Sequence, residues 1–190
     1  MEKIILASQS PRRKILLKNI TENFEVIPSN FDEIWDENKN LEENILDFSE
    51  GKAFYVAKNN IGKIVIGCDT FPVHSKNGNY FKPKDLDDAK KMLLSYSNEV
   101  LSVFSGISLV KILENGEVKK ISKIVETKIF WGKITENDVE KWLEKNEWQG
   151  RSGGFSIEGF SLQFVKKIDG CFLNIVGLPV NILKNMLEGF

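Results

Sequence analysis

The chain has 190 residues, of which 42% are hydrophobic and 28% are charged, and its formal net charge is −1. A chain of this length can bury a full core without disulfides or metals, and we expect a single domain over residues 1–190. The near-zero net charge argues against a nucleic-acid partner, because a surface that follows phosphates carries a basic excess.

No stretch approaches the roughly 20 apolar residues of a membrane span, and the N-terminus has no leader-like apolar region, so we expect no membrane partner. Cys68 and Cys171 match neither a disulfide framework nor a zinc motif. We interpret both as structural residues of a cytoplasmic protein, where thiols stay reduced.

The chain opens on an apolar run at residues 4–7, which predicts a strand, and continues into Ser8-Gln9-Ser10-Pro11-Arg12-Arg13. Ser10 is a suitable N-cap, and Pro11 fits the first position of a helix. The free amides of a first helical turn attract anions, and two arginines there are favourable only with a negative group between them. This turn is therefore a candidate anion site, and the alternative is an ordinary capped helix with solvated arginines.

A second strand is predicted at residues 24–28, and an acidic loop that contains Glu33 follows it. Residues 41–59 show helical spacing of apolar side chains, and Lys52 interrupts the apolar stripe. A lysine in that position either extends along the edge of the stripe or points into a cleft.

An almost continuous apolar run at residues 63–68 predicts a strand buried on both faces, which ends at Asp69 and Thr70. Open α/β sheets place their chemistry at such strand ends, so Asp69 is a candidate functional carboxylate. Beyond it, Asn77-Gly78 predicts a hairpin turn, and Asp85 is a candidate helix cap.

The second half of the chain predicts two long strands over residues 100–113 and 117–131, and a helix that starts at Thr135. Residues 150–159 are rich in glycine and indicate a loop that approaches another group closely. The remaining segments are predicted as a strand pair at residues 160–168 and 171–176 and a last helix opened by Pro179.

Cations and carboxylates gather at predicted element ends and loops: Arg12, Arg13, Lys52, Lys82, Glu33 and Asp69. Such a set suits metal-assisted phosphoryl chemistry, because cations and a divalent ion must offset the roughly four negative charges of a triphosphate. The P-loop and dinucleotide-binding fingerprints are absent from the sequence, and His74 is its one histidine, which excludes most histidine-based triads.

Several segments, in order and across essentially the whole chain, closely resemble the Maf family of nucleoside triphosphate pyrophosphatases. They are residues 5–13, 32–33, 51–53, 66–70, 82–83, 153–159 and 174–179. The resemblance implies an α/β fold like that of inosine triphosphate pyrophosphatases, with a long mixed β-sheet and two lobes around a nucleotide cleft. It also implies a possible homodimer.

The resemblance further implies hydrolysis of a nucleoside triphosphate to its monophosphate and pyrophosphate with a divalent metal, Mg²⁺ or Mn²⁺. Asp69 would accept the proton of the attacking water, and Glu33 and Asp69 would hold the metal. The phosphates would be bound by Ser8, Arg13, Lys52 and Lys82.

Three positions that the resemblance links to base choice disagree with one another. Arg12 and Thr70 look like the subgroup acting on dTTP and UTP, whereas Glu158 looks like the subgroup acting on 7-methyl-GTP. A carboxylate only accepts hydrogen bonds, while the edge of uracil or thymine both accepts and donates. Two of three positions favour dTTP and UTP; the alternatives are a 7-methyl-GTP pyrophosphatase and a nucleotide-binding regulator of cell division with incidental turnover.

Overall fold

The computed structural model describes residues 3–76, 78–79 and 81–190. The chain divides into two compact units, which are described separately below. Unit 1 comprises residues 1–69, 105–125 and 177–190, and unit 2 comprises residues 70–104 and 126–176. The expectation of one domain over residues 1–190 stays a prediction.

The strands form a seven-stranded mixed sheet in the order β2-β1-β3-β5-β6-β7, with β4 paired to β3. Pairing is parallel between β1 and its neighbours β2 and β3, and antiparallel between β3 and β4 and between β6 and β7. The strands are β1 Ile4–Leu6, β2 Phe24–Val26, β3 Ile64–His74, β4 Gly78–Asn79, β5 Val100–Ile112, β6 Val118–Trp131 and β7 Val165–Asp169. The predicted α/β class with a long mixed sheet is confirmed.

Six α-helices are found in the described part of the chain, together with 3₁₀ turns at Ser152–Gly154 and Phe160–Phe164. The helices are α1 Pro11–Leu17, α2 Leu41–Ala57, α3 Leu86–Ser95, α4 Glu136–Glu144, α5 Phe172–Val176 and α6 Val180–Glu188. The predicted caps Ser10, Asp85 and Thr135 each accept a hydrogen bond from the backbone N–H three residues on. No described helix has the length and apolarity needed to cross a lipid bilayer.

Strand β3 differs from its prediction, because it does not end at Asp69 but continues to His74. The residues after Asp69 keep the pattern of a strand, since Phe71 is buried and Val73 and His74 pair with β4. This antiparallel pairing supports the predicted hairpin, although Asn77 of its turn lies outside the described residues. Asp69 is therefore a mid-strand residue.

The predicted strand pair near the C-terminus is wrong for most of its length. Only Val165–Asp169 forms a strand, which pairs with β6, while Phe160–Phe164 is a 3₁₀ helix and Phe172–Val176 is α-helical. Short apolar runs do not distinguish strand from helix. Within unit 2, the Asn174 side chain donates to the Val103 carbonyl oxygen at 2.9 Å, a tertiary contact that fixes α5 and that spacing alone does not reveal.

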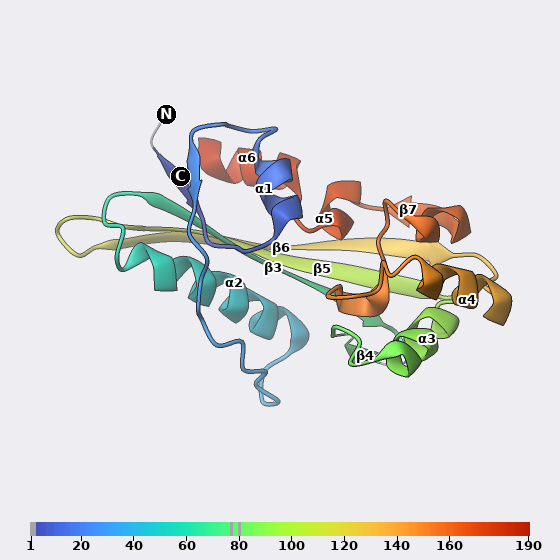
Figure 1. The fold of residues 1–190 in the computed structure, drawn as a ribbon. Coiled ribbons are helices and arrows are strands. Elements are labelled where there is room, and N and C mark those ends of the chain that lie inside the picture. Colours follow the sequence, from blue (N-terminus) through green and yellow to red (C-terminus); the bar gives the residue numbers. More distant parts are fainter. Residues whose placement is uncertain (1–2, 77, 80) are drawn as a thin grey trace. The chain divides into compact units, whose positions relative to one another are not determined.

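Helix α2 packs unusually closely against the strands of unit 1, on the face opposite to α1 and α6 (Figure 1). A Cβ built at Gly67 of β3 would overlap the Ser49 carbonyl oxygen, and one at Gly106 of β5 would crowd the Ile45 carbonyl oxygen. The two glycines thus let the helix backbone approach the sheet. This approach fixes the position of Lys52, next to the buried Ala53.

Candidate active site

The turn before α1 forms a small network of hydroxyl groups and amides in unit 1. The Ser8 hydroxyl oxygen accepts from the Ser10 N–H at 3.2 Å and from Nη1 of Arg13 at 3.4 Å. The Ser10 hydroxyl oxygen accepts from the Arg13 N–H at 3.4 Å. Ser8 is buried, so its hydroxyl is held in place rather than solvated. The predicted capped turn is present, with one of its two arginines folded back over it.

Arg13 is oriented by a residue 164 positions away in the sequence. Its Nε donates to the Gly177 carbonyl oxygen at 2.9 Å, and its Nη2 lies 3.8 Å from Oδ1 of Asp69. The Arg13 side chain is 12% exposed. Because a guanidinium is a rigid planar fork, fixing Nε also fixes the direction of the other two nitrogens. Arg13 therefore presents its charge beside Ser8 and Asp69.

Lys52 of α2 lies between two carboxylates. Its Nζ is 2.7 Å from Oδ2 of Asp69 and 2.8 Å from Oε1 of Glu33. The side chains of Lys52 and Asp69 are 12% and 11% exposed, whereas that of Glu33 is 44% exposed. The Asp69 carboxylate thus has a lysine on one oxygen and an arginine near the other, which favours its ionised form.

Two features of the sequence build this arrangement. Gly67 and Asp69 lie two residues apart on β3 and so point to the same face, which is the face that α2 covers. On α2, a Cβ at Gly51 would overlap the ring of Phe31, so that ring lies directly on the helix backbone. Phe31 thereby anchors the loop that carries Glu33 beside Lys52.

Arg12 lies next to Arg13 in α1 and is half-buried in unit 1. The other three predicted site residues belong to unit 2. Thr70 is half-buried in β3, and Glu158 is exposed after the buried Ile157. Lys82 is exposed, and its neighbour Phe81 accepts at its carbonyl oxygen a hydrogen bond of 3.0 Å from the Gly153 N–H. This bond joins the segment of Lys82 to the glycine-rich loop within unit 2.

Two buried donor groups, one in the glycine-rich loop and one just before it, have no acceptor among the described residues. They are Nη1 of Arg151 and Nε1 of Trp148. A buried guanidinium nitrogen without an acceptor is costly, so Arg151 stands out as a residue that the sequence did not single out as a ligand.

A divalent cation can be tested against the donors of unit 1. The described residues contain no group of three histidine, cysteine, aspartate or glutamate side chains placed to hold a metal ion. Asp69 and Glu33, however, both lie within 2.8 Å of the same ammonium nitrogen. Two carboxylate oxygens that converge on one cation fit a hard divalent ion whose other ligands are phosphate and water oxygens.

The positions of the site side chains also depend on four residues that the sequence analysis did not assign this role: Gly177, Gly67, Gly106 and Phe31. A glycine inside an apolar strand is a recognised sign of close backbone approach, and it could have identified Gly67. No signal in the sequence identifies the carbonyl oxygen of Gly177, because its donors, Arg13 and the Cys68 thiol at 3.4 Å, are far from it in the sequence.

The sequence matches known proteins over nearly its whole length. The family described as Maf-like protein matches residues 3–190. A dTTP/UTP pyrophosphatase of Clostridium botulinum is 39% identical over 191 residues, covering 98% of this chain and 96% of its own length. Another of the same name from Clostridium kluyveri is 38% identical over 192 residues, covering 98% of this chain and 97% of its own length.

Solved structures give weaker matches. The Ham1 protein of Staphylococcus aureus has a TM-score of 0.49 and 20% identity, over 98% of each chain. A HAM1 protein from Coxiella burnetii has a TM-score of 0.48 and 12% identity, over 100% of each chain. The sequence matches are stronger, because they extend over almost every residue at 38–39% identity. On the strength of these matches, the chain belongs to the Maf family.

Proposed function

We propose that this chain is a nucleoside triphosphate pyrophosphatase that hydrolyses dTTP and UTP to the monophosphate and pyrophosphate. Relatives of that name at 38% and 39% identity support the reaction class and the substrates. The observation that carries the proposal is the buried Asp69 carboxylate between Lys52 at 2.7 Å and Arg13 at 3.8 Å. A negative group flanked by two cations suits a site where water must attack a polyphosphate.

Asp69 is the proton acceptor in this proposal. A water molecule attacks the α-phosphorus and its oxygen forms the new P–O bond. One of its protons passes to the Asp69 carboxylate, and the other stays on that oxygen. The bond between the α-phosphorus and the bridging oxygen breaks, and pyrophosphate leaves with the electron pair. Ionisation of Asp69 is favoured by its two cationic neighbours, and an ionised carboxylate is what proton acceptance requires.

The cations of unit 1 bind the phosphates in this proposal. Arg13 and Lys52 supply the cationic groups, and Ser8 adds a hydroxyl donor beside Arg13. Charge that develops on the leaving pyrophosphate is stabilised by groups already held in place, which is the most effective form of electrostatic catalysis. The role of Lys82 as a further phosphate ligand is proposed from the resemblance of its motif.

We further propose that a divalent cation, Mg²⁺ or Mn²⁺, is bound by Asp69 and Glu33. When bound, such an ion lowers the pKa of a coordinated water and offsets phosphate charge. The ammonium of Lys52 now lies between these two carboxylates and would turn to the phosphates. Titration of the nucleotide-free protein with Mn²⁺, followed by electron paramagnetic resonance, tests this, since Asp69→Asn and Glu33→Gln should each weaken binding.

Base choice is assigned to Arg12, Thr70 and Glu158. The names of the relatives favour dTTP and UTP over 7-methyl-GTP, as Arg12 and Thr70 do. Glu158 is exposed, so its carboxylate is available to accept from the N3–H of uracil or thymine.

The test is a panel of nucleoside triphosphates assayed for pyrophosphate release with Mg²⁺ and with Mn²⁺. Turnover of dTTP and UTP well above 7-methyl-GTP is the expected result. Binding of nucleotides without turnover of any of them would overturn the proposal in favour of a nucleotide-binding regulator. A homodimer and a cytoplasmic location also remain proposals, and sedimentation of the purified protein and fractionation of cells test them.

A further inference from the structure

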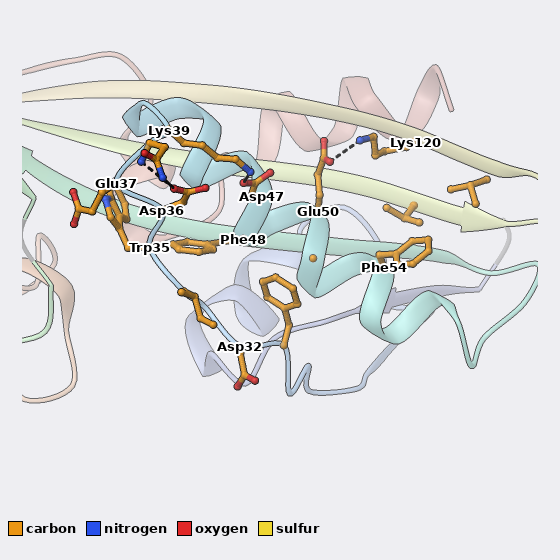
Figure 2. A pocket seen from close by; sticks show the side chains of 16 residues that line it. Asp32, Trp35, Asp36, Glu37, Lys39, Asp47, Phe48, Glu50, Phe54 and Lys120 are labelled. Carbon is orange, nitrogen blue, oxygen red and sulfur yellow. Dashed lines mark hydrogen bonds and ion pairs between the residues drawn. The ribbon is translucent and has the colours of Figure 1, made fainter.

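A broad groove lies on unit 1, beside the loop that carries Glu33 but lined by other residues. Its walls are the loop at residues 31–39, the face of α2 from Asp47 to Phe54, and parts of β5 and β6. Figure 2 shows carboxylates on the loop and on α2, with Lys120 of β6 reaching Glu50. The groove has a volume of about 1090 Å³, more than a typical small-molecule pocket of about 300–1,000 Å³.

Several apolar side chains that line the groove are exposed. Ile34 is 79% exposed, Val118 is 45% exposed and Phe54 is 40% exposed, while Phe48 and Val110 also line the groove and are buried. Single exposed apolar residues are ordinary, but several around one groove mark an interaction surface.

The polar side chains of the groove are mostly acidic. Five carboxylates and two lysines line it, which gives a formal charge of −3, against −1 for the whole chain. The two lysines are already paired, Lys39 with Asp47 and Lys120 with Glu50, each at 2.5 Å. Asp32 and Glu37 form no ion pair with the residues that the structure describes. Uncompensated negative charge is thus concentrated on the loop wall.

Asp36 strengthens this charge. The backbone N–H and then the side-chain amide of Asn38 donate to its carboxylate and lower the pKa of Asp36. The carboxylate therefore stays ionised at neutral pH and below. Asp36 thus contributes a stable negative charge to the loop wall.

We propose that this groove docks a basic amphipathic helix of a partner protein. Apolar side chains line the groove together with carboxylates that come from both the loop and α2. A helix with an apolar stripe flanked by lysines or arginines complements that combination of groups, and helix-in-groove docking is a common mode of recognition. The negative charge of the groove disfavours an acidic partner.

The probe is a synthetic peptide of about four helical turns with leucine on one face and lysine elsewhere, titrated calorimetrically into the full chain without nucleotide. We expect one-to-one binding that weakens as NaCl rises from about 50 to about 300 mM. A peptide with glutamate in place of lysine should not bind, nor should one with the same residues in an order that forms no apolar stripe.

Matched variants locate the binding. Asp32→Asn with Glu37→Gln should weaken peptide binding by about tenfold or more, and Ile34→Ser with Phe54→Ser should do the same. The control pair Glu114→Gln with Glu117→Gln removes the same charge from the β5–β6 turn and should bind like the unmodified chain. These side chains are exposed, so each variant should fold.

Three results would overturn the proposal. One is equal binding of the lysine and glutamate peptides. A second is binding by the groove variants that is as tight as that of the unmodified chain. The third is a dimer in solution that Ile34→Glu with Phe54→Glu converts to a monomer, because a second copy of the chain would then cover the groove. Each readout is a binding or mass measurement, so it is independent of whether the chain hydrolyses nucleotides.

Discussion

Nζ of Lys52 lies 2.7 Å from Oδ2 of Asp69 and 2.8 Å from Oε1 of Glu33, so one ammonium group is shared by two carboxylates of different exposure. Asp69 is held on a buried strand, whereas Glu33 is on a loop. The shared lysine therefore links a buried strand of unit 1 to a more exposed loop of the same unit. The first two predictions follow from this relationship.

Asp69→Asn should lower kcat for dTTP by about 10²–10⁴-fold, the usual contribution of a positioned base, while KM changes less. The amide keeps the shape of the side chain but cannot take a proton. The control is Asp47→Asn, which removes a carboxylate from another lysine pair of the same unit and should keep full activity. Pyrophosphate release by Asp69→Asn at the normal rate would remove Asp69 from the mechanism.

Lys52→Met should raise KM for dTTP by about tenfold or more and lower the free energy of unfolding by about 1–3 kcal/mol. It leaves the carboxylates of Asp69 and Glu33 without their common cation. Glu33→Gln is the matched comparison. Its free energy of unfolding should fall by less than about 1 kcal/mol, because the Glu33 side chain is 44% exposed. Urea unfolding and steady-state kinetics measure both effects, and equal stability losses would contradict the central position of Lys52.

Glu158→Gln should raise the ratio of activity toward dTTP and UTP over activity toward 7-methyl-GTP. An amide can both donate and accept at the base edge, whereas a carboxylate only accepts and favours a positively charged base. The ratio of kcat/KM values for the three substrates is the measurement. An unchanged ratio would mean that Glu158 does not contact the base.

Gly67→Ala should lower the free energy of unfolding by about 1–3 kcal/mol, because its Cβ overlaps the Ser49 carbonyl oxygen and pushes α2 from the sheet. The displacement also carries Lys52 away from Asp69, so kcat/KM should fall with stability. Gly189→Ala is the control, since its Cβ meets only ordinary contacts at 3.7 Å and beyond. Identical thermal unfolding of Gly67→Ala and the unmodified chain would exclude the close approach.

Arg151→Met should raise the free energy of unfolding by about 1 kcal/mol, because it removes a buried donor that has no acceptor. If Arg151 is retained in order to bind substrate, the same variant should raise KM for dTTP. Arg151→Lys separates the two effects, since it keeps the charge while removing Nη1. A loss of stability in Arg151→Met would show that the group has a structural partner in solution.

Local signals in the sequence predicted most of the elements correctly. Capping residues such as Ser10 and Thr135, the period of α2 and the two long strands β5 and β6 all lie where spacing placed them, because each is specified by residues close in sequence. The resemblance to the Maf family is confirmed over residues 3–190.

Features that depend on distant contacts were missed. The sequence predicted a strand end at Asp69 and Thr70, whereas β3 continues to His74, where its last residues pair with β4. The helical state of residues 172–176 likewise depends on tertiary contacts. At the site, the sequence supplied Arg13 and Asp69 as candidates, but not the Gly177 carbonyl that aims the guanidinium.

The ion pairs of Lys52 also bear on how products would depart. Without nucleotide, the lysine already has two internal counterions, so a phosphate ligand must displace them rather than fill an empty position. A triphosphate with its metal competes well for the ammonium, whereas a monophosphate brings less charge and competes poorly. Asp69 and Glu33 would then act as an internal competitor that returns to Lys52 after each turnover and limits inhibition by the monophosphate product.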